Sequence, residues 1–427
     1  MLSILVALSV IQRAGVAAAL KGISLALGFA ISISLARMLG PDGFGVYAFC
    51  FSVISICALP VGTSLNQFVM REVARAKKSG IEGLVKGLIN RALYWIFCFG
   101  SLISILLIFL SDQFDKHLLL FALPLITLTA LVVLFTEVIR GCGLVLQSQW
   151  PDMVLRPLIF LTTVRMLSSQ SGLQPDTAML AYTIAVFLTL LVLVLTFLKT
   201  VRTEAYRVSS PTFKNREWLG AIPWFMSNNA IGVFSVQLAF VILGYSSERV
   251  SEVGAFQLAL SFALFINLPL VIANLFLGPK IAGWWQAGEL QANLKIVTRV
   301  TRIISLFSAA GCVLLLTFSD VILDALYGED FVFVADAMQI MVVGQLINVV
   351  FGPAGLMLMA CGFERQALLG RTLGTAISLM VTIVTVREWG AVGAACGVTA
   401  GLLVWNVWMM IKLREHVGTP ILFLLGR

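Results

Sequence analysis

Residues Leu35–Tyr47, which read LARMLGPDGFGVY, join the first long apolar run of the sequence to the second. The Pro41-Asp42-Gly43 triplet inside this stretch is typical of a turn, because proline presets φ and glycine accepts positive φ. Gly45 and Tyr47 then open the second apolar run. The stretch therefore predicts a tight connection between two long helices.

A related pattern returns one half-chain later, where Leu243-Gly244 matches Leu39-Gly40. Beyond this match, a constant offset of 209 residues pairs Gly45 with Gly254, Tyr47 with Phe256, Ser52 with Ser261, Pro60 with Pro269 and Arg71 with Lys280. The matches include a glycine at a helix start, a proline inside a helix and a cation at its exit. They predict two copies of one module, a lobe over 1–200 and a lobe over 219–427, joined by a cytoplasmic linker over 201–218.

The composition is that of a membrane protein, since 59% of the residues are hydrophobic and only 12% are charged. A helical span needs about 20 apolar residues. Twelve runs qualify: 14–36, 46–68, 88–110, 118–139, 153–172, 177–198, 219–243, 253–277, 300–319, 335–358, 366–386 and 390–411. The predicted fold is all-α and integral to the membrane, with about twelve transmembrane helices in two like-oriented six-helix lobes around a central cavity.

The charge pattern predicts the topology of these spans. Lys and Arg cluster in every second gap between the runs, whereas 303–364 holds neither and includes Asp320, Asp324, Glu329, Asp330 and Asp336. Cytoplasmic loops carry the excess of Lys and Arg, so both termini are predicted to be cytoplasmic. The net charge of +8 is thereby explained by topology, and no nucleic-acid partner is expected.

Four cations are candidates for the wall of a substrate cavity: Lys21, Arg37, Arg71 and Arg165. Lys21 lies about a third of the way along the first run, and a cation at that depth is expected to face a cavity or to extend toward the cytoplasm. Arg165 either lines a cavity or marks the outer end of a short span. Arg37 lies where the first run meets water, which also fits an interface anchor.

Amides inside the apolar runs are the second group of candidates: Asn66, Asn228, Asn267 and Asn274. Any one of them could simply hold helices together. Their concentration in the first two spans of each half favours polar faces that meet between the lobes. Glu137 and Arg140 lie one turn apart, and they form either a proton or cation site or a structural ion pair.

Several chemistries lack the residues that they need. No GxxxxGK[ST] loop is present, which leaves ATP hydrolysis unsupported. With only two histidines, at positions 117 and 416, and seven cysteines without paired spacing, we expect no catalytic residue, metal site or cofactor. Internal repeats, a polar interior and deep cations favour a secondary transporter, and the cations favour an anionic substrate such as a pyrophosphate.

Four stretches of the sequence resemble the polysaccharide-biosynthesis flippases. They are the 35–47 motif, the MREVA sequence of Met70–Ala74, Leu155-Arg156-Pro157 and the SEVGAF sequence of Ser251–Phe256. These belong to the multidrug/oligosaccharidyl-lipid/polysaccharide exporter superfamily, and the resemblance covers essentially the whole chain. It implies a MATE-like fold in a bacterial inner membrane. It also implies transport of an undecaprenyl-pyrophosphate-linked oligosaccharide, such as an O-antigen or capsule repeat unit for lipopolysaccharide or exopolysaccharide biosynthesis, to the periplasmic leaflet.

The resemblance further implies that cavity cations hold the pyrophosphate while amides meet the sugar. Membrane lipids, a polysaccharide polymerase and a chain-length regulator are the other expected partners. Two alternatives remain. A drug or cation antiporter of the same superfamily predicts a carboxylate-lined cavity, whereas Glu137 is the one carboxylate inside a predicted span apart from Asp336, which lies at the edge of the run 335–358. A membrane enzyme such as a polymerase or ligase predicts a large outer loop, whereas the predicted outer loops are short and acidic.

Overall fold

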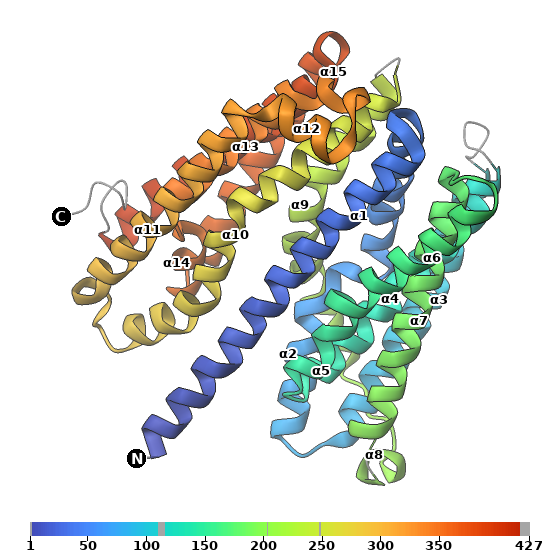
Figure 1. Cartoon of the computed structure of the whole chain (residues 1–427). Coiled ribbons are helices and arrows are strands. Elements are labelled where there is room, and N and C mark those ends of the chain that lie inside the picture. Colours follow the sequence, from blue (N-terminus) through green and yellow to red (C-terminus); the bar gives the residue numbers. More distant parts are fainter. Residues whose placement is uncertain (1, 110–115, 203, 247–248, 419–427) are drawn as a thin grey trace. The chain divides into compact units, whose positions relative to one another are not determined.

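The computed structural model describes residues 2–109, 116–202, 204–246 and 249–418, which form helices joined by short connections, without a strand (Figure 1). The long helices are α1 Leu2–Val61, α2 Asn66–Lys78, α3 Glu82–Phe109, α4 Lys116–Gly141, α6 Arg156–Ser171, α7 Pro175–Thr200, α9 Asn215–Ser246, α10 Ser251–Gln286, α11 Leu290–Thr317, α13 Ala335–Phe351 and α15 Glu364–Val417. Short helices complete the order: α5 Val145–Trp150, α8 Glu204–Val208, α12 Ser319–Tyr327 and α14 Ala354–Ala360.

The described helices accommodate the predicted twelve spans. Eight segments are long and apolar enough to cross a membrane. Two of them, in α1 and α15, contain a sharp break, at Gly40 with φ 68° and at Gly390 with φ 53°, and each side of the break is long enough for a crossing of its own. The eight segments, two of them divided, give ten crossings, and α6 and α9 bring the number to twelve. The structure confirms the all-α, multi-pass membrane fold expected from the sequence.

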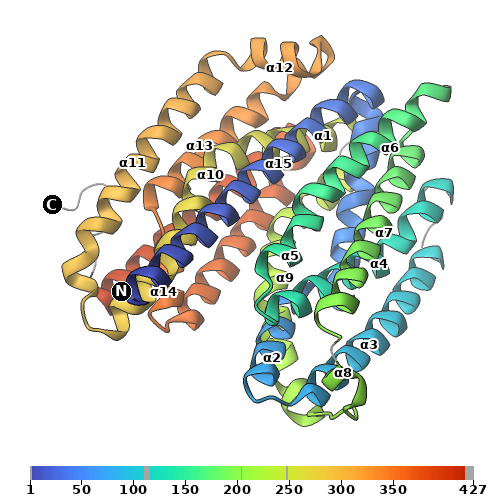
Figure 2. The ribbon, with the colours of Figure 1, turned by 60° about the horizontal axis from the view of Figure 1, so that its bottom comes forward.

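The chain forms two compact units. One unit is Phe49–Gln237, in which α4 packs against α2, α3 and α7, and α6 packs against α7 (Figure 2). Fully buried side chains such as Leu125, Ile126 and Met179 fill the space between these helices. The segment after α8 is fastened to α3, because Lys86 Nζ donates to the carbonyls of Arg207 and Ser209 at 3.2 and 2.9 Å.

The other unit combines Met1–Ala48 with Leu238–Arg427. Its α13 packs against α10 and α15 (Figure 2). The first part of α1 packs on α10 and α12, since the Phe29 ring lies 5.2 Å from the Phe262 ring and 4.8 Å from the Phe265 ring, measured between centroids. Ser32 Oγ lies 3.1 Å from the hydroxyl of Tyr327.

These units do not coincide with the lobes that the repeat predicts. The first span packs with the second half of the chain, and the first part of α9, up to Gln237, belongs with the first half. A sequence repeat groups residues by ancestry, whereas a compact unit groups them by contact. The lobes 1–200 and 219–427 and the linker 201–218 therefore stay a prediction.

Two predicted spans are interrupted rather than continuous. The run 46–68 breaks after Val61. The run 335–358 breaks at Gly352, whose φ is 70°, before Pro353. Glycine adopts these backbone angles without steric cost, and proline cannot continue the hydrogen bonds of the preceding helix.

Candidate functional site

The break in the second span lies between α1 and α2, within the Phe49–Gln237 unit. After α1 ends, Gly62 adopts φ 152°, and Thr63–Leu65 form a 3-10 turn before α2 begins. A helix break inside a membrane frees backbone carbonyls, and these must be satisfied by protein or water. Such breaks are tolerated where the chain lines a cavity.

Side chains satisfy the freed carbonyls at this break. Thr63 Oγ1 donates to the Ala58 carbonyl at 3.0 Å, and Ser64 Oγ donates to the Leu59 carbonyl at 2.8 Å. The indole Nε1 of Trp95 in α3 donates to the Pro60 carbonyl at 2.9 Å. The break is therefore a stable part of the fold.

A cavity of about 350 Å³ opens beside the break. Its wall comes from α1, the 3-10 turn, α2, α4, α7 and α9. The residues that line it are Phe51, Ile54, Ser55, Ala58, Leu59, Thr63, Ser64, Asn66, Leu125, Thr129, Tyr182, Val233 and Gln237. All of them belong to one compact unit, and none carries an ionised side chain at neutral pH.

Two amide side chains, Gln237 and Asn66, lie in the wall of this cavity. The Oε1 atom of Gln237 is buried and has no hydrogen-bond partner among the described residues. Asn66 uses its Oδ1 to accept from the Gln67 backbone N–H at 2.7 Å. A buried acceptor without a partner costs free energy, so its place in a cavity wall points to a ligand or water that fills it.

Aromatic rings form another part of the wall. The Phe51 and Tyr182 rings lie edge to face at 5.5 Å between centroids. Behind Tyr182, the Arg156 guanidinium lies 5.8 Å from the ring centroid and pairs with Asp152 at 2.9 Å. The positive charge of Arg156 is thus balanced by the carboxylate of Asp152. The wall presents flat apolar rings beside neutral polar groups.

The other unit holds a chain of amides between α10, α13 and α15. Asn348 Nδ2 donates to Asn267 Oδ1 at 3.2 Å and to Gln345 Oε1 at 3.3 Å. Asn406 Nδ2 donates to Asn348 Oδ1 at 3.0 Å and to the Leu402 carbonyl at 2.9 Å. This chain joins three helices, as interhelical amides commonly do in membranes. Asn267, a predicted substrate residue, is thereby engaged with protein.

The predicted cations differ in their surroundings. Arg37 is exposed and donates from Nε and Nη2 to the carbonyls of Leu326 and Ala325, at 2.7 and 2.6 Å. Arg71 is paired with Glu72 at 3.0 Å. Lys21 is half-buried and makes no hydrogen bond or ion pair with the residues that the structure describes. Arg165 is exposed on α6.

The remaining candidates are also placed. Glu137 and Arg140 form an ion pair at 3.3 Å within α4, and Glu137 is 7% exposed. Asn274 is half-buried, with an Oδ1 that has no partner among the described residues. Asn228 lies in α9, and its side chain is outside the described ones. Among all the predicted residues, the structure brings together only Glu137 and Arg140, within its described part.

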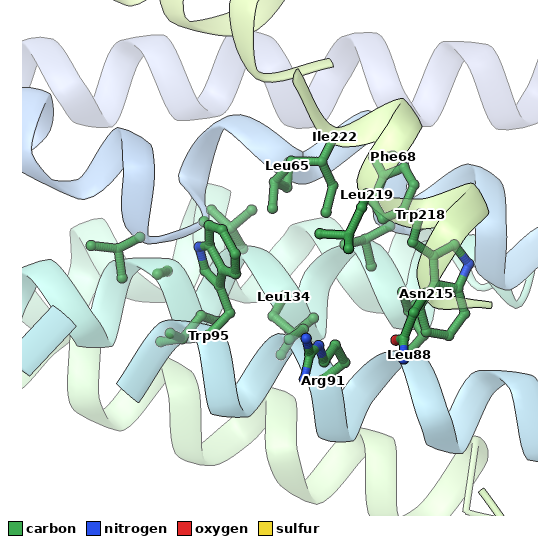
Figure 3. A pocket seen from close by; sticks show the side chains of 17 residues that line it. Leu65, Phe68, Leu88, Arg91, Trp95, Leu134, Asn215, Trp218, Leu219 and Ile222 are labelled. Atoms are coloured by element: carbon green, nitrogen blue, oxygen red, sulfur yellow. The ribbon is translucent and has the colours of Figure 1, made fainter. Parts of the chain in front are cut away.

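A second, smaller pocket of about 60 Å³ is lined in part by Val61, Gly62 and Leu65 at the break (Figure 3). Leu65, Phe68, Leu88, Trp95 and Trp218 are among its lining residues, and Arg91 is the one cation among them. The pocket is almost wholly apolar, whereas the larger cavity also presents hydroxyl and amide groups.

The sequence and the structure were compared with those of known proteins. No family model matches the sequence. Stage V sporulation protein B of Bacillus subtilis (strain 168) is 22% identical over 419 residues, which cover 88% of this chain and 78% of that protein. The inward-facing structure of a MATE family multidrug resistance transporter of the MOP superfamily superposes with a TM-score of 0.74 at 16% identity, over 93% of this chain and 96% of that one.

The lipid II flippase MurJ, in an inward closed conformation, superposes with a TM-score of 0.73 at 12% identity, over 92% of this chain and 86% of that one. The chain has the MATE-like fold. This confirms the resemblance to the exporter superfamily at the level of the fold, over nearly the full length. The MATE-like fold is thus shared by this chain, a drug transporter and a lipid flippase.

Sequence reasoning missed most of the cavity wall. Thr63, Ser64 and Thr129 are small hydroxyl residues inside apolar runs, where they commonly bond to their own helix, and Tyr182 has no distinguishing neighbour. Gln237 did carry a signal, since it is an amide within a long apolar run. That signal does not distinguish a cavity residue from an interhelical contact.

Proposed function

We propose that this protein is a secondary transporter that moves a lipid-linked oligosaccharide across the membrane by alternating access. The observation that carries the proposal is the polar cavity beside an interrupted span, in a MATE-like fold. Interrupted membrane helices are where transporters commonly place their substrate and ion sites. The solved structures of this fold include the lipid II flippase MurJ.

The proposed substrate is an undecaprenyl-pyrophosphate-linked repeat unit, of the O-antigen, capsule or exopolysaccharide kind. Lys21, which is half-buried and makes no described ion pair, supports an anionic group in the substrate. The inside-negative membrane potential favours outward movement of an anion by about 2.3 kcal/mol per charge per 100 mV. We place the protein in a bacterial inner membrane, without enzymatic activity, beside a polymerase and a chain-length regulator.

A drug or cation antiporter is the second candidate, because the solved relatives also include multidrug transporters. That chemistry requires carboxylates that attract cations. Among the described residues, the cavity wall offers none, and Glu137 is held by Arg140. The observed chemistry of the wall therefore favours the flippase.

The test is a deletion strain complemented with the wild type, Lys21→Ala or Arg165→Ala at matched expression. Surface polysaccharide and lipid-linked repeat units on the cytoplasmic side are both measured. We expect the deletion to abolish surface polymer and to accumulate lipid-linked units. We expect Lys21→Ala to restore less than a tenth of the polymer. Lys199→Ala, at an exposed position in the last turn of α7, is the control and should restore it fully.

Other outcomes decide between the alternatives. Full rescue by Lys21→Ala and Arg165→Ala removes both cations from the site and leaves the flippase. Intact surface glycan with a changed drug sensitivity contradicts the flippase and supports the antiporter.

A further inference from the structure

We infer that the polar cavity of the Phe49–Gln237 unit is a subsite for one neutral sugar ring. The inference rests on the proposed function, because it assigns this cavity to the glycan part of the transported lipid. It is carried by the size of the cavity, the hydrogen-bonding groups in its wall, its lack of charge and its aromatic side.

The size fits a small ligand better than a packing defect. The cavity holds about 350 Å³. Pockets for small molecules range from about 300 to 1,000 Å³, whereas a single water molecule takes up about 30 Å³. The cavity is therefore large enough for a sugar ring with its exocyclic groups.

The hydroxyl groups of the wall are arranged as acceptors. Ser55 Oγ donates its proton to the Phe51 carbonyl at 2.7 Å, and Thr129 Oγ1 donates to the Leu125 carbonyl at 2.6 Å. Thr63 and Ser64 likewise donate to carbonyls of α1. The hydroxyl oxygens of Ser55, Thr63 and Thr129 keep lone pairs that can accept from a ligand hydroxyl.

The amides complete a set that suits a ligand with many hydroxyl groups. Gln237 Oε1 is an acceptor without a partner. Asn66 has its Oδ1 engaged by the Gln67 N–H, so its NH₂ group is the part that remains to donate. A ligand that both donates and accepts at several adjacent atoms matches this wall. A sugar hydroxyl does both.

The absence of charge on the lining residues selects against ions. A bound metal cation prefers carboxylate oxygens, and a phosphate prefers Arg or Lys; the thirteen lining residues include neither kind. The Phe51 and Tyr182 rings offer apolar faces and edges, against which the C–H groups of a sugar ring can pack. A neutral hexose or N-acetylhexosamine meets all of these conditions.

The inference is tested with the purified full-length protein in lipid nanodiscs. Saturation-transfer difference NMR measures binding of D-glucose, D-galactose, D-mannose, N-acetyl-D-glucosamine and N-acetyl-D-galactosamine, each alone. Gln237→Met and Thr129→Val remove hydrogen-bonding groups from the wall while nearly keeping side-chain shape. Gln67→Met and Thr162→Val are the matched controls, because Gln67 and Thr162 are exposed and do not line the cavity.

We expect at least one sugar to bind the wild type and both controls. We expect Gln237→Met to weaken that binding about tenfold or more and Thr129→Val to weaken it about threefold to tenfold. Two results overturn the inference: no sugar of the panel binds the wild type, or the two cavity variants bind as tightly as the controls. Thermal unfolding of each variant confirms that it is folded.

The outcome is separable from that of the proposed function. Suppose that sugar binding depends on Gln237 while deletion of the gene leaves surface glycan intact. That pair of results supports the subsite and contradicts the flippase. A deletion that traps lipid-linked units, with no sugar binding in the cavity, contradicts the subsite and leaves the flippase.

Discussion

Arg37 has a structural function that needs no ligand. Its guanidinium donates to the carbonyls of Ala325 and Leu326, in the last turn of α12. The last carbonyls of a helix lack partners within the helix and carry a partial negative charge, so a cation there is favourable. The location of Arg37 at the outer end of the first span stays a prediction. A contribution of Arg37 to substrate binding stays a prediction.

Tyr327 ends α12, next to the carbonyls that Arg37 contacts. We expect its hydroxyl group to make the stability of the protein depend on pH at high pH. Tyr327 is 3% exposed, and burial raises the pKa of its phenol to about 12 from 10.0, against a smaller lowering by the hydrogen bond with Ser32. Because the pKa is raised on folding, the stabilisation is complete below pH 10 and is lost as the pH rises toward 12. The shift corresponds to about 2 to 3 kcal/mol.

The measurement compares thermal unfolding of the wild type and Tyr327→Phe between pH 8 and pH 12. We expect the melting temperature of the wild type to fall more steeply above pH 10, because phenylalanine has no proton to lose. Parallel curves for the two proteins contradict the assignment.

Gly45 and Gly254, which the repeat pairs with each other, meet at a close approach of two helices. A Cβ added at Gly45 would lie 2.1 Å from the Val250 carbonyl oxygen, and one added at Gly254 would lie 3.2 Å from the Gly45 nitrogen. The 35–47 motif therefore contacts, through Gly45, the position that the sequence repeat pairs with it. Glycine at both positions is what allows the two backbones to approach.

Gly45→Ala should destabilise the protein by about 1 to 3 kcal/mol, because the backbone must move to admit the methyl group. Gly22→Ala, in the same helix, is the control, since an added Cβ there meets nothing within 4 Å. Alanine is the better helix former, so this control should be neutral or more stable by up to about 1 kcal/mol. Differential scanning fluorimetry of both variants checks the prediction, and equal melting temperatures would refute it.

At this scale the sequence predicts the spans well and their interruptions poorly. The twelve runs agree with the described helices because length and hydropathy are local properties. The breaks at Gly62 and Gly352 are not readable in the same way, since most glycines in apolar runs, such as Gly28, remain helical. A break depends on whether distant groups, such as the Trp95 indole, can satisfy the freed carbonyls.

Across the whole chain, contact partners are harder to predict than spans. The repeat pairs Gly45 with Gly254 as equivalent positions, but it says nothing about which half of the chain each span packs with. The boundaries between the units fall at Ala48 and Gln237, inside α1 and α9 rather than in the linker. The site was only partly predictable for the same reason: Asn66 was predicted from the polarity of its span, while its neighbours in the cavity come from four other helices.

The predicted topology is tested by labelling single cysteines. In a protein whose seven native cysteines are replaced, Lys78→Cys and Asp330→Cys lie at exposed positions in gaps of opposite predicted side. A membrane-impermeant maleimide added to intact spheroplasts should label Asp330→Cys and should label Lys78→Cys only after lysis. The reversed pattern would invert the topology and place both termini outside.

The packing of the first span with the second half of the chain has a consequence for synthesis. About 190 residues separate Ala48 from Leu238, where the rest of that unit begins. At a translation rate of about 5 to 20 residues per second, the first span waits about 10 to 40 s before its partners leave the ribosome. During that interval its face with Lys21 and Ser32 has neither α10 nor Tyr327 beside it. The first span is therefore made well before the helices that it packs against in the finished protein.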